Sequence, residues 1–138
     1  MRDHDQAAAL IGWALSGLVI VGLVAVGVGA LVTPRMASVQ FGIVTGEPRA
    51  LALVRAMGVR DVVIGVLLAL LAMERARDTL AWAMFATALV AFVDLAVVMA
   101  DRRTAAGAPQ RPFDRSCWLH AIGAIGFLVT GTVLRAGL

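Results

Sequence analysis

The chain has 138 residues, of which 61% are hydrophobic and 15% are charged. A water-soluble domain carries about a quarter charged residues, so this composition indicates one compact integral membrane domain. The net charge of +3 comes from arginine, because the sequence contains no lysine. The arginines lie mostly at the ends of apolar runs and form no basic face, so nucleic-acid binding is not expected.

Four long apolar segments predict membrane-spanning helices, taken in chain order as residues 7–32, 48–73, 79–100 and 115–134. Each is long enough to cross a hydrocarbon core of about 30 Å. Pro48 suits the first turn of the second helix, while Asp78 and Asp114 are candidate N-caps of the third and fourth. Short connections favour antiparallel neighbours. The predicted fold is therefore an all-α, four-helix, up-down bundle in a membrane.

The first segment carries a face of small residues that favours close helix packing. Gly22, Ala25 and Gly29 recur at helical spacing, as in many membrane helix contacts. A domain of this size buries little surface by itself, so a homodimer is expected.

Arginine counts in the connections predict the orientation. Connections one and three would share a side with Arg35, Arg49, Arg102, Arg103, Arg111 and Arg115, against four arginines on the other side. The positive-inside tendency then places both termini outside, most simply in a bacterial inner membrane.

Four ionisable residues interrupt the apolar segments: Arg60, Asp61, Asp94 and His120. Each costs a few kcal/mol in hydrocarbon, so such residues usually face a cavity and have a function. In the simplest topology Asp61 lies about 18–20 Å along its helix, Asp94 about 10 Å before the end of the next, and His120 about 8 Å after the start of the last. All four then share one half of the bundle and are candidate catalytic residues, although Arg60 and Asp61 could instead form a structural ion pair.

Three further residues are candidates for substrate binding. Gly58 shares a narrow face with Asp61 and Gly65, Arg55 lies nearer the headgroups, and Trp118 lies near a helix end, where interfacial anchoring is the usual role. Neither a metal nor a cofactor is expected, because two histidines and one cysteine are too few for haem pairs or a zinc site.

The pattern from Arg55 to Asp61, Arg-Ala-Met-Gly-Val-Arg-Asp, precedes Gly65, Asp94 and His120 and follows a Phe41-Gly42 pair. It resembles a family of small four-helix membrane proteins known as domain of unknown function 4267. Some similar proteins accompany polyketide tailoring enzymes, so the resemblance implies action on greasy, oxygenated, polyketide-like molecules.

The favoured hypothesis is an enzyme that opens an epoxide on a lipophilic small molecule, by hydrolysis or cyclisation. This chemistry needs a carboxylate to activate the nucleophile and an acid or cation for the departing oxygen. Soluble epoxide hydrolases of the Asp-Arg-Asp type resemble this inventory in chemistry but not in fold. The alternatives are a small dimeric, proton-coupled exporter and a non-catalytic membrane assembly subunit.

Overall fold

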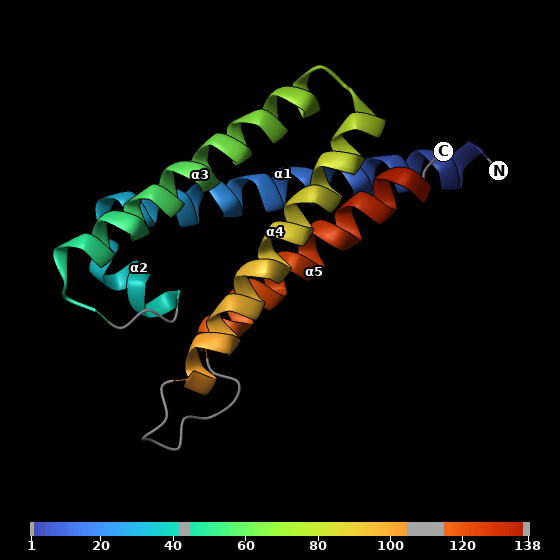
Figure 1. Ribbon diagram of the computed structural model, residues 1–138. Helices are drawn as coiled ribbons and strands as arrows, with labels where there is room; N and C mark the ends of the chain where they lie inside the picture. Colours follow the sequence, from blue (N-terminus) through green and yellow to red (C-terminus); the bar gives the residue numbers. More distant parts are fainter. Residues whose placement is uncertain (1, 42–44, 105–114, 137–138) are drawn as a thin grey trace.

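The computed structural model describes residues 2–41, 45–104 and 115–136, which form five helices (Figure 1). They are α1 (Arg2–Val32), α2 (Pro34–Gln40), α3 (Pro48–Met73), α4 (Arg77–Thr104) and α5 (Arg115–Ala136). All but α2 are long and apolar enough to cross a membrane. The chain is therefore an integral membrane protein of the all-α class, as its composition predicts.

The predicted segments correspond to the four long helices, with differences at their ends. Helix α3 has the predicted bounds, and the Glu47 side chain caps it by accepting a hydrogen bond from the Ala50 N–H at 2.7 Å. The N-cap prediction for Asp78 is wrong, because α4 already begins at Arg77. Asp78 instead forms an ion pair with Arg135 at 3.1 Å, an attraction between the first turn of α4 and the last turn of α5. The predicted cap Asp114 lies outside the described residues.

Helix α2 was not predicted, because it lies in the connection between the first two predicted segments. The segment follows Thr33 with Pro34 at the first helical position, where the missing N–H costs nothing. At its other end the Phe41 N–H donates to the Ala37 carbonyl oxygen at 2.8 Å. Ala37 and Phe41 are buried in a small core with Ala30 and Val54, and this packing stabilises so short a helix.

The long helices form two main pairs, α1 with α3 and α4 with α5 (Figure 1). The first pair crosses where Gly27 meets Gly58. A Cβ added at either glycine would lie 2.7 Å from the carbonyl oxygen of the other, so only glycine allows this approach. The expected face of Gly22, Ala25 and Gly29 does not make this contact: Ala25 is exposed, and a Cβ at either glycine would meet open space.

A hydrophobic core joins the two pairs at one end of the molecule. Leu68 of α3, Leu80 and Met84 of α4, and Leu134 of α5 are each at most 2% exposed there. The chain termini and the α3–α4 turn lie at this end, as the up-down topology predicts (Figure 1). Toward α2 the two pairs diverge, and this divergence makes room for the cavity that holds the ionisable side chains.

Candidate functional site

Arg60 bridges the two aspartates of the membrane-spanning helices. Its Nε and Nη2 lie 3.1 and 3.0 Å from Asp61 Oδ1. Its Nη1 and Nη2 lie 3.4 and 2.8 Å from Asp94 Oδ1 and Oδ2. One guanidinium thus holds two carboxylates from different helices.

The reach of the Arg60 side chain makes this arrangement possible. Neighbouring residues point about 100° apart on a helix, so Arg60 and Asp61 start from different faces of α3. Asp61 is on the buried face beside Gly58 and Gly65, against α1, whereas Arg60 is about half-buried at the edge facing α4. The long arginine bends back to Asp61 and also crosses to α4. The two aspartates therefore meet through Arg60.

The charge of this group is unbalanced. The side chains of Asp61 and Asp94 are only 10% and 21% exposed, and they share one guanidinium. Two ionised carboxylates with one arginine leave an excess negative charge inside an apolar environment, which is costly. A proton on one aspartate or on His120 would restore balance, so the group is suited to hold and transfer a proton.

His120 completes the group from α5. The residue is 8% exposed, and its buried Nε2 atom has no hydrogen-bond partner among the described residues. It is close enough to interact electrostatically with Asp94, Asp61 and Arg60. Its ring packs beside Phe41, with centroids 6.0 Å apart and planes tilted by 34°. A buried nitrogen without a hydrogen-bond partner is uncommon and calls for an explanation, of which a catalytic role is one.

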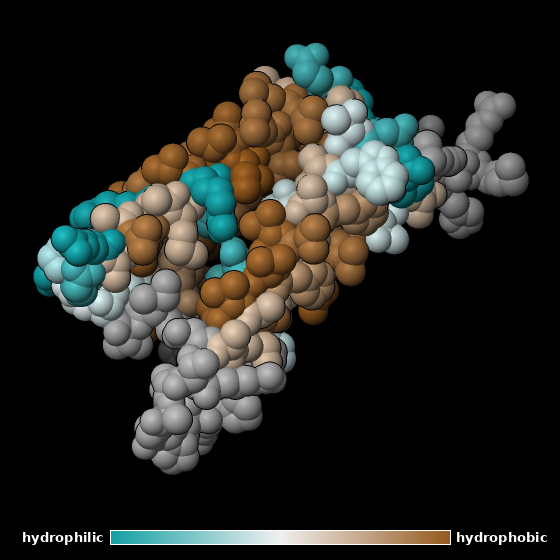
Figure 2. Space-filling model, viewed as in Figure 1, coloured by the Kyte–Doolittle hydropathy of each residue, from teal (hydrophilic) through white to brown (hydrophobic). Residues whose placement is uncertain are grey.

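All four ionisable residues line one cavity of about 550 Å³, within the usual size range of small-molecule sites. The remainder of the wall is mostly apolar and comes from α1, α3, α4, α5 and Phe41. Figure 2 shows hydrophilic atoms in a hollow between α3 and α4, surrounded by hydrophobic surface. The wall of this cavity is thus complementary to a lipophilic molecule that carries a small polar group.

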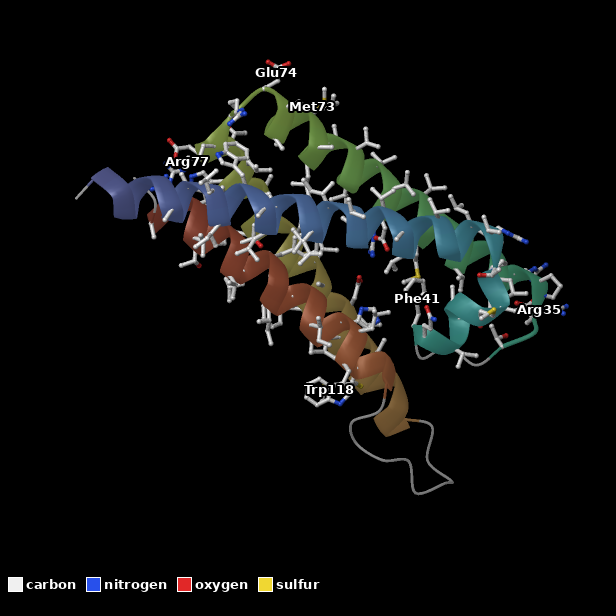
Figure 3. All side chains as sticks on the ribbon, turned by 180° about the vertical axis from the view of Figure 1, so that it is seen from behind. Arg35, Phe41, Met73, Glu74, Arg77 and Trp118 are labelled. Carbon is white, nitrogen blue, oxygen red and sulfur yellow. The ribbon has the colours of Figure 1, made fainter. Side chains whose placement is uncertain are left out.

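The three predicted substrate-binding residues are not part of this cavity wall. Gly58 is covered by Gly27 of α1, so its role in the structure is helix packing. Arg55 is exposed on α3. Trp118 is 57% exposed and points away from the bundle (Figure 3). The four ionisable candidates thus line one cavity, whereas these three residues lie outside its wall.

Phe41 and Thr87 are among the wall residues to which sequence reasoning assigned no role in the site. Phe41 lies at the end of α2 and packs on His120; its position depends on a short helix that hydropathy does not reveal. Thr87 is buried in α4, one turn from Val90 and two from Asp94, and its hydroxyl donates to the Ala83 carbonyl oxygen at 2.8 Å. The sequence did carry one signal for Thr87: it lies two helical turns before Asp94, which places both on the same face of the helix.

The donor set does not favour a metal ion. Within the described part of the chain, no group of three or more His, Cys, Asp or Glu side chains has the arrangement of a metal site. The two aspartates already accept hydrogen bonds from Arg60. What the group offers instead is a base, a cation and a place for a proton.

Comparison with known proteins identifies a family but no activity. Residues 20–134 match the family described as "Domain of unknown function (DUF4267)". Neither the curated proteins nor the solved structures gave a match.

Proposed function

The chain belongs to the DUF4267 family, and from the geometry of its intramembrane site we propose that it is a membrane-embedded enzyme that opens an epoxide on a lipophilic, polyketide-like molecule. The product is a diol when water attacks, or a cyclic ether when a hydroxyl of the substrate attacks. The reaction needs no electron transfer, and the chain's own side chains supply both the base and the acid.

One observation carries the proposal: the unpartnered Nε2 of His120 shares an apolar cavity with two aspartates bridged by Arg60. The nitrogen can accept a proton, and the guanidinium can stabilise negative charge on oxygen. Epoxide opening needs a base and a cation at the same time, because a nucleophile attacks the epoxide carbon while the epoxide oxygen departs with negative charge. The greasy wall suits a lipophilic substrate.

In the first step, Nε2 of His120 accepts the proton of the attacking water or hydroxyl. The oxygen of that nucleophile bonds to an epoxide carbon, and the bond between this carbon and the epoxide oxygen breaks. Asp94, which is held at both oxygens by Arg60, stabilises the imidazolium that forms.

In the second step, the departing oxygen takes the electron pair and is met by Arg60. Both hydrogen bonds from Arg60 to Asp61 go to Oδ1, so Oδ2 is the atom assigned to carry the balancing proton. Asp61 donates this proton to the oxygen, and His120 returns its own to Asp61 after product release. One proton is removed and one is added, so the cycle balances.

The two alternatives fit the same residues less closely. A subunit whose charges pair with a partner protein would present unpaired charges, whereas Arg60 already pairs with both aspartates. An exporter needs a path across the whole membrane, whereas the polar groups described here gather in one cavity. We also propose a homodimer, from the small-residue face of α1, in a bacterial inner membrane with both termini outside, from the arginine counts of the connections. No nucleic-acid partner is proposed.

The experiment is conversion of lipophilic epoxides by purified protein in detergent, with products resolved by chromatography and mass spectrometry. Oxygen-18 water distinguishes the outcomes, since a diol gains one labelled oxygen and a cyclic ether gains none. Absence of conversion, together with substrate movement across sealed proteoliposomes, would replace the enzyme by the exporter.

A further inference from the structure

A second hollow adjoins the cavity between α3 and α4. It has a volume of about 480 Å³ and is lined almost wholly by apolar side chains. Ile64, Thr87 and Val90 line both spaces, so the two adjoin along these residues. Figure 2 shows this hydrophobic surface between the two helices, leading away from the hydrophilic atoms.

The sequence builds this groove by helical spacing. On α3, Ile64, Leu67 and Leu71 follow Arg60 at intervals of three or four residues, and Glu74 ends the row. On α4, Val90, Thr87 and Ala83 repeat the pattern from Asp94. The rise of a helix makes the α3 row about 20 Å long. One face of each helix thus carries both the charged group and a long apolar track.

Small residues on α4 keep the track open. Ala83 and Ala86 line it with single methyl groups, and Thr87 turns its hydroxyl to the Ala83 carbonyl oxygen. The far end of the groove is marked by exposed Glu74, opposite the end that holds Phe41 (Figure 3). The groove is therefore mostly apolar and has the charged site near one end.

We propose that this groove is the subsite for an unbranched hydrocarbon portion of the substrate, whose epoxide lies at Arg60, Asp61 and Asp94. The inference rests on the proposed function and adds a substrate shape: a linear chain with its reactive group near one end. The shared lining residues carry this assignment, because a molecule in the cavity extends into the groove without crossing a polar wall.

The probe is a straight-chain terminal epoxide of palmitoyl length with a photoreactive diazirine near its far end. After illumination of the protein in detergent, cross-linked residues are mapped by mass spectrometry. Labelling is expected at Leu71 and Ala83. Ala86→Phe should lower this labelling several-fold by filling the groove. Ala96→Phe is the matched control, because Ala96 is exposed on α4 and lines neither space.

Ala83→Leu is a second filling variant in case Ala86→Phe does not fold. Labelling spread equally over exposed residues such as Leu89 and Val97 would overturn the subsite. So would labelling that excess unlabelled epoxide does not reduce, or that a diazirine phosphatidylcholine reproduces in full, since either result makes the groove an ordinary lipid contact. Asp94→Asn should keep the labelling. Labelling of the groove without any conversion of the epoxide would contradict the proposed reaction but would still support the subsite.

Discussion

Nη2 of Arg60 on α3 lies 2.8 Å from Oδ2 of Asp94 on α4, and the same nitrogen lies 3.0 Å from Asp61. Helices α3 and α4 follow one another in the chain, yet each packs mainly on another partner. This ion pair therefore connects the two helix pairs across the cavity. One side chain both fixes the site and supplies its positive charge.

Arg60→Met should destabilise the protein, because it leaves two partly buried carboxylates without their cation. Breaking a fully buried pair costs about 3–5 kcal/mol, and the cost here should fall somewhat below that range because Arg60 is 37% exposed. Thermal unfolding in detergent measures the change. Adding Asp61→Asn and Asp94→Asn should recover much of the loss. If the triple variant were less stable than Arg60→Met alone, the charge explanation would be wrong.

Gly27→Ala should also destabilise, for a steric reason. The new Cβ would lie 2.7 Å from the Gly58 carbonyl oxygen, and overpacking of this kind costs about 1–3 kcal/mol. Gly29→Ala on the same helix is the control, because its Cβ would meet open space. Its effect should stay below about 1 kcal/mol. Equal melting temperatures of the two variants would contradict the glycine crossing of α1 and α3.

Much of the fold could be predicted from the sequence, because hydropathy marks spans and helical rise fixes depth. Those two quantities alone are enough to place Asp61, Asp94 and His120 in the same half of the bundle. Packing faces were harder to predict. In a membrane every face of a helix can be apolar, so spacing alone did not distinguish the contact at Gly27 from the open face of Gly22 and Gly29.

The sequence allowed us to predict which ionisable residues form the candidate site, but not the hydrogen bonds between them. Asp94 carried no charged neighbour in its helix, and only the three-dimensional arrangement shows that Arg60 bends across to it. Phe41 was missed because α2 has seven residues and owes its stability to tertiary packing rather than to a strong local pattern.

Phe41→Leu should reduce activity more than stability. Leucine keeps most of the buried apolar volume, but it removes the ring that packs beside His120 at 6.0 Å. The catalytic rate should fall while the melting temperature changes little, since volume-conserving swaps cost less than about 1.5 kcal/mol. Phe92→Leu is the control, because Phe92 is 42% exposed on α4. Unchanged turnover of an epoxide by Phe41→Leu would show that His120 does not need this contact.

The small-residue face of α1 predicts a dimer contact. Ala25 is exposed between Gly22 and Gly29, whose added Cβ atoms would be unobstructed. With Cys117 replaced by alanine, Ala25→Cys should form a disulfide-linked dimer in native membranes on mild oxidation. Ala96→Cys, on an exposed face of α4, should give much less. Monomer alone from Ala25→Cys, while a known dimer is captured in the same membranes, would remove this face as the interface.

The proposed unit of Asp94 and His120 makes a non-additive prediction. His120→Gln and Asp94→Asn should each slow epoxide opening, and the double variant should be little slower than either single variant, because groups that act as one unit share their effect. Arg55→Gln should be mild, since Arg55 is exposed and outside the cavity wall. If the double variant instead showed the product of the two single-variant rate losses, the two residues would act independently.

The most direct test compares two aspartates of one helix. Asp94 lines the cavity, whereas Asp78 is paired with Arg135 at the opposite end of α4. Turnover of a lipophilic epoxide is measured for Asp94→Asn and Asp78→Asn, both purified in detergent and both checked for folding. We expect Asp94→Asn to lose on the order of 10²–10⁴-fold in rate and Asp78→Asn to remain near wild type. Full activity in a folded Asp94→Asn protein would contradict the composite site.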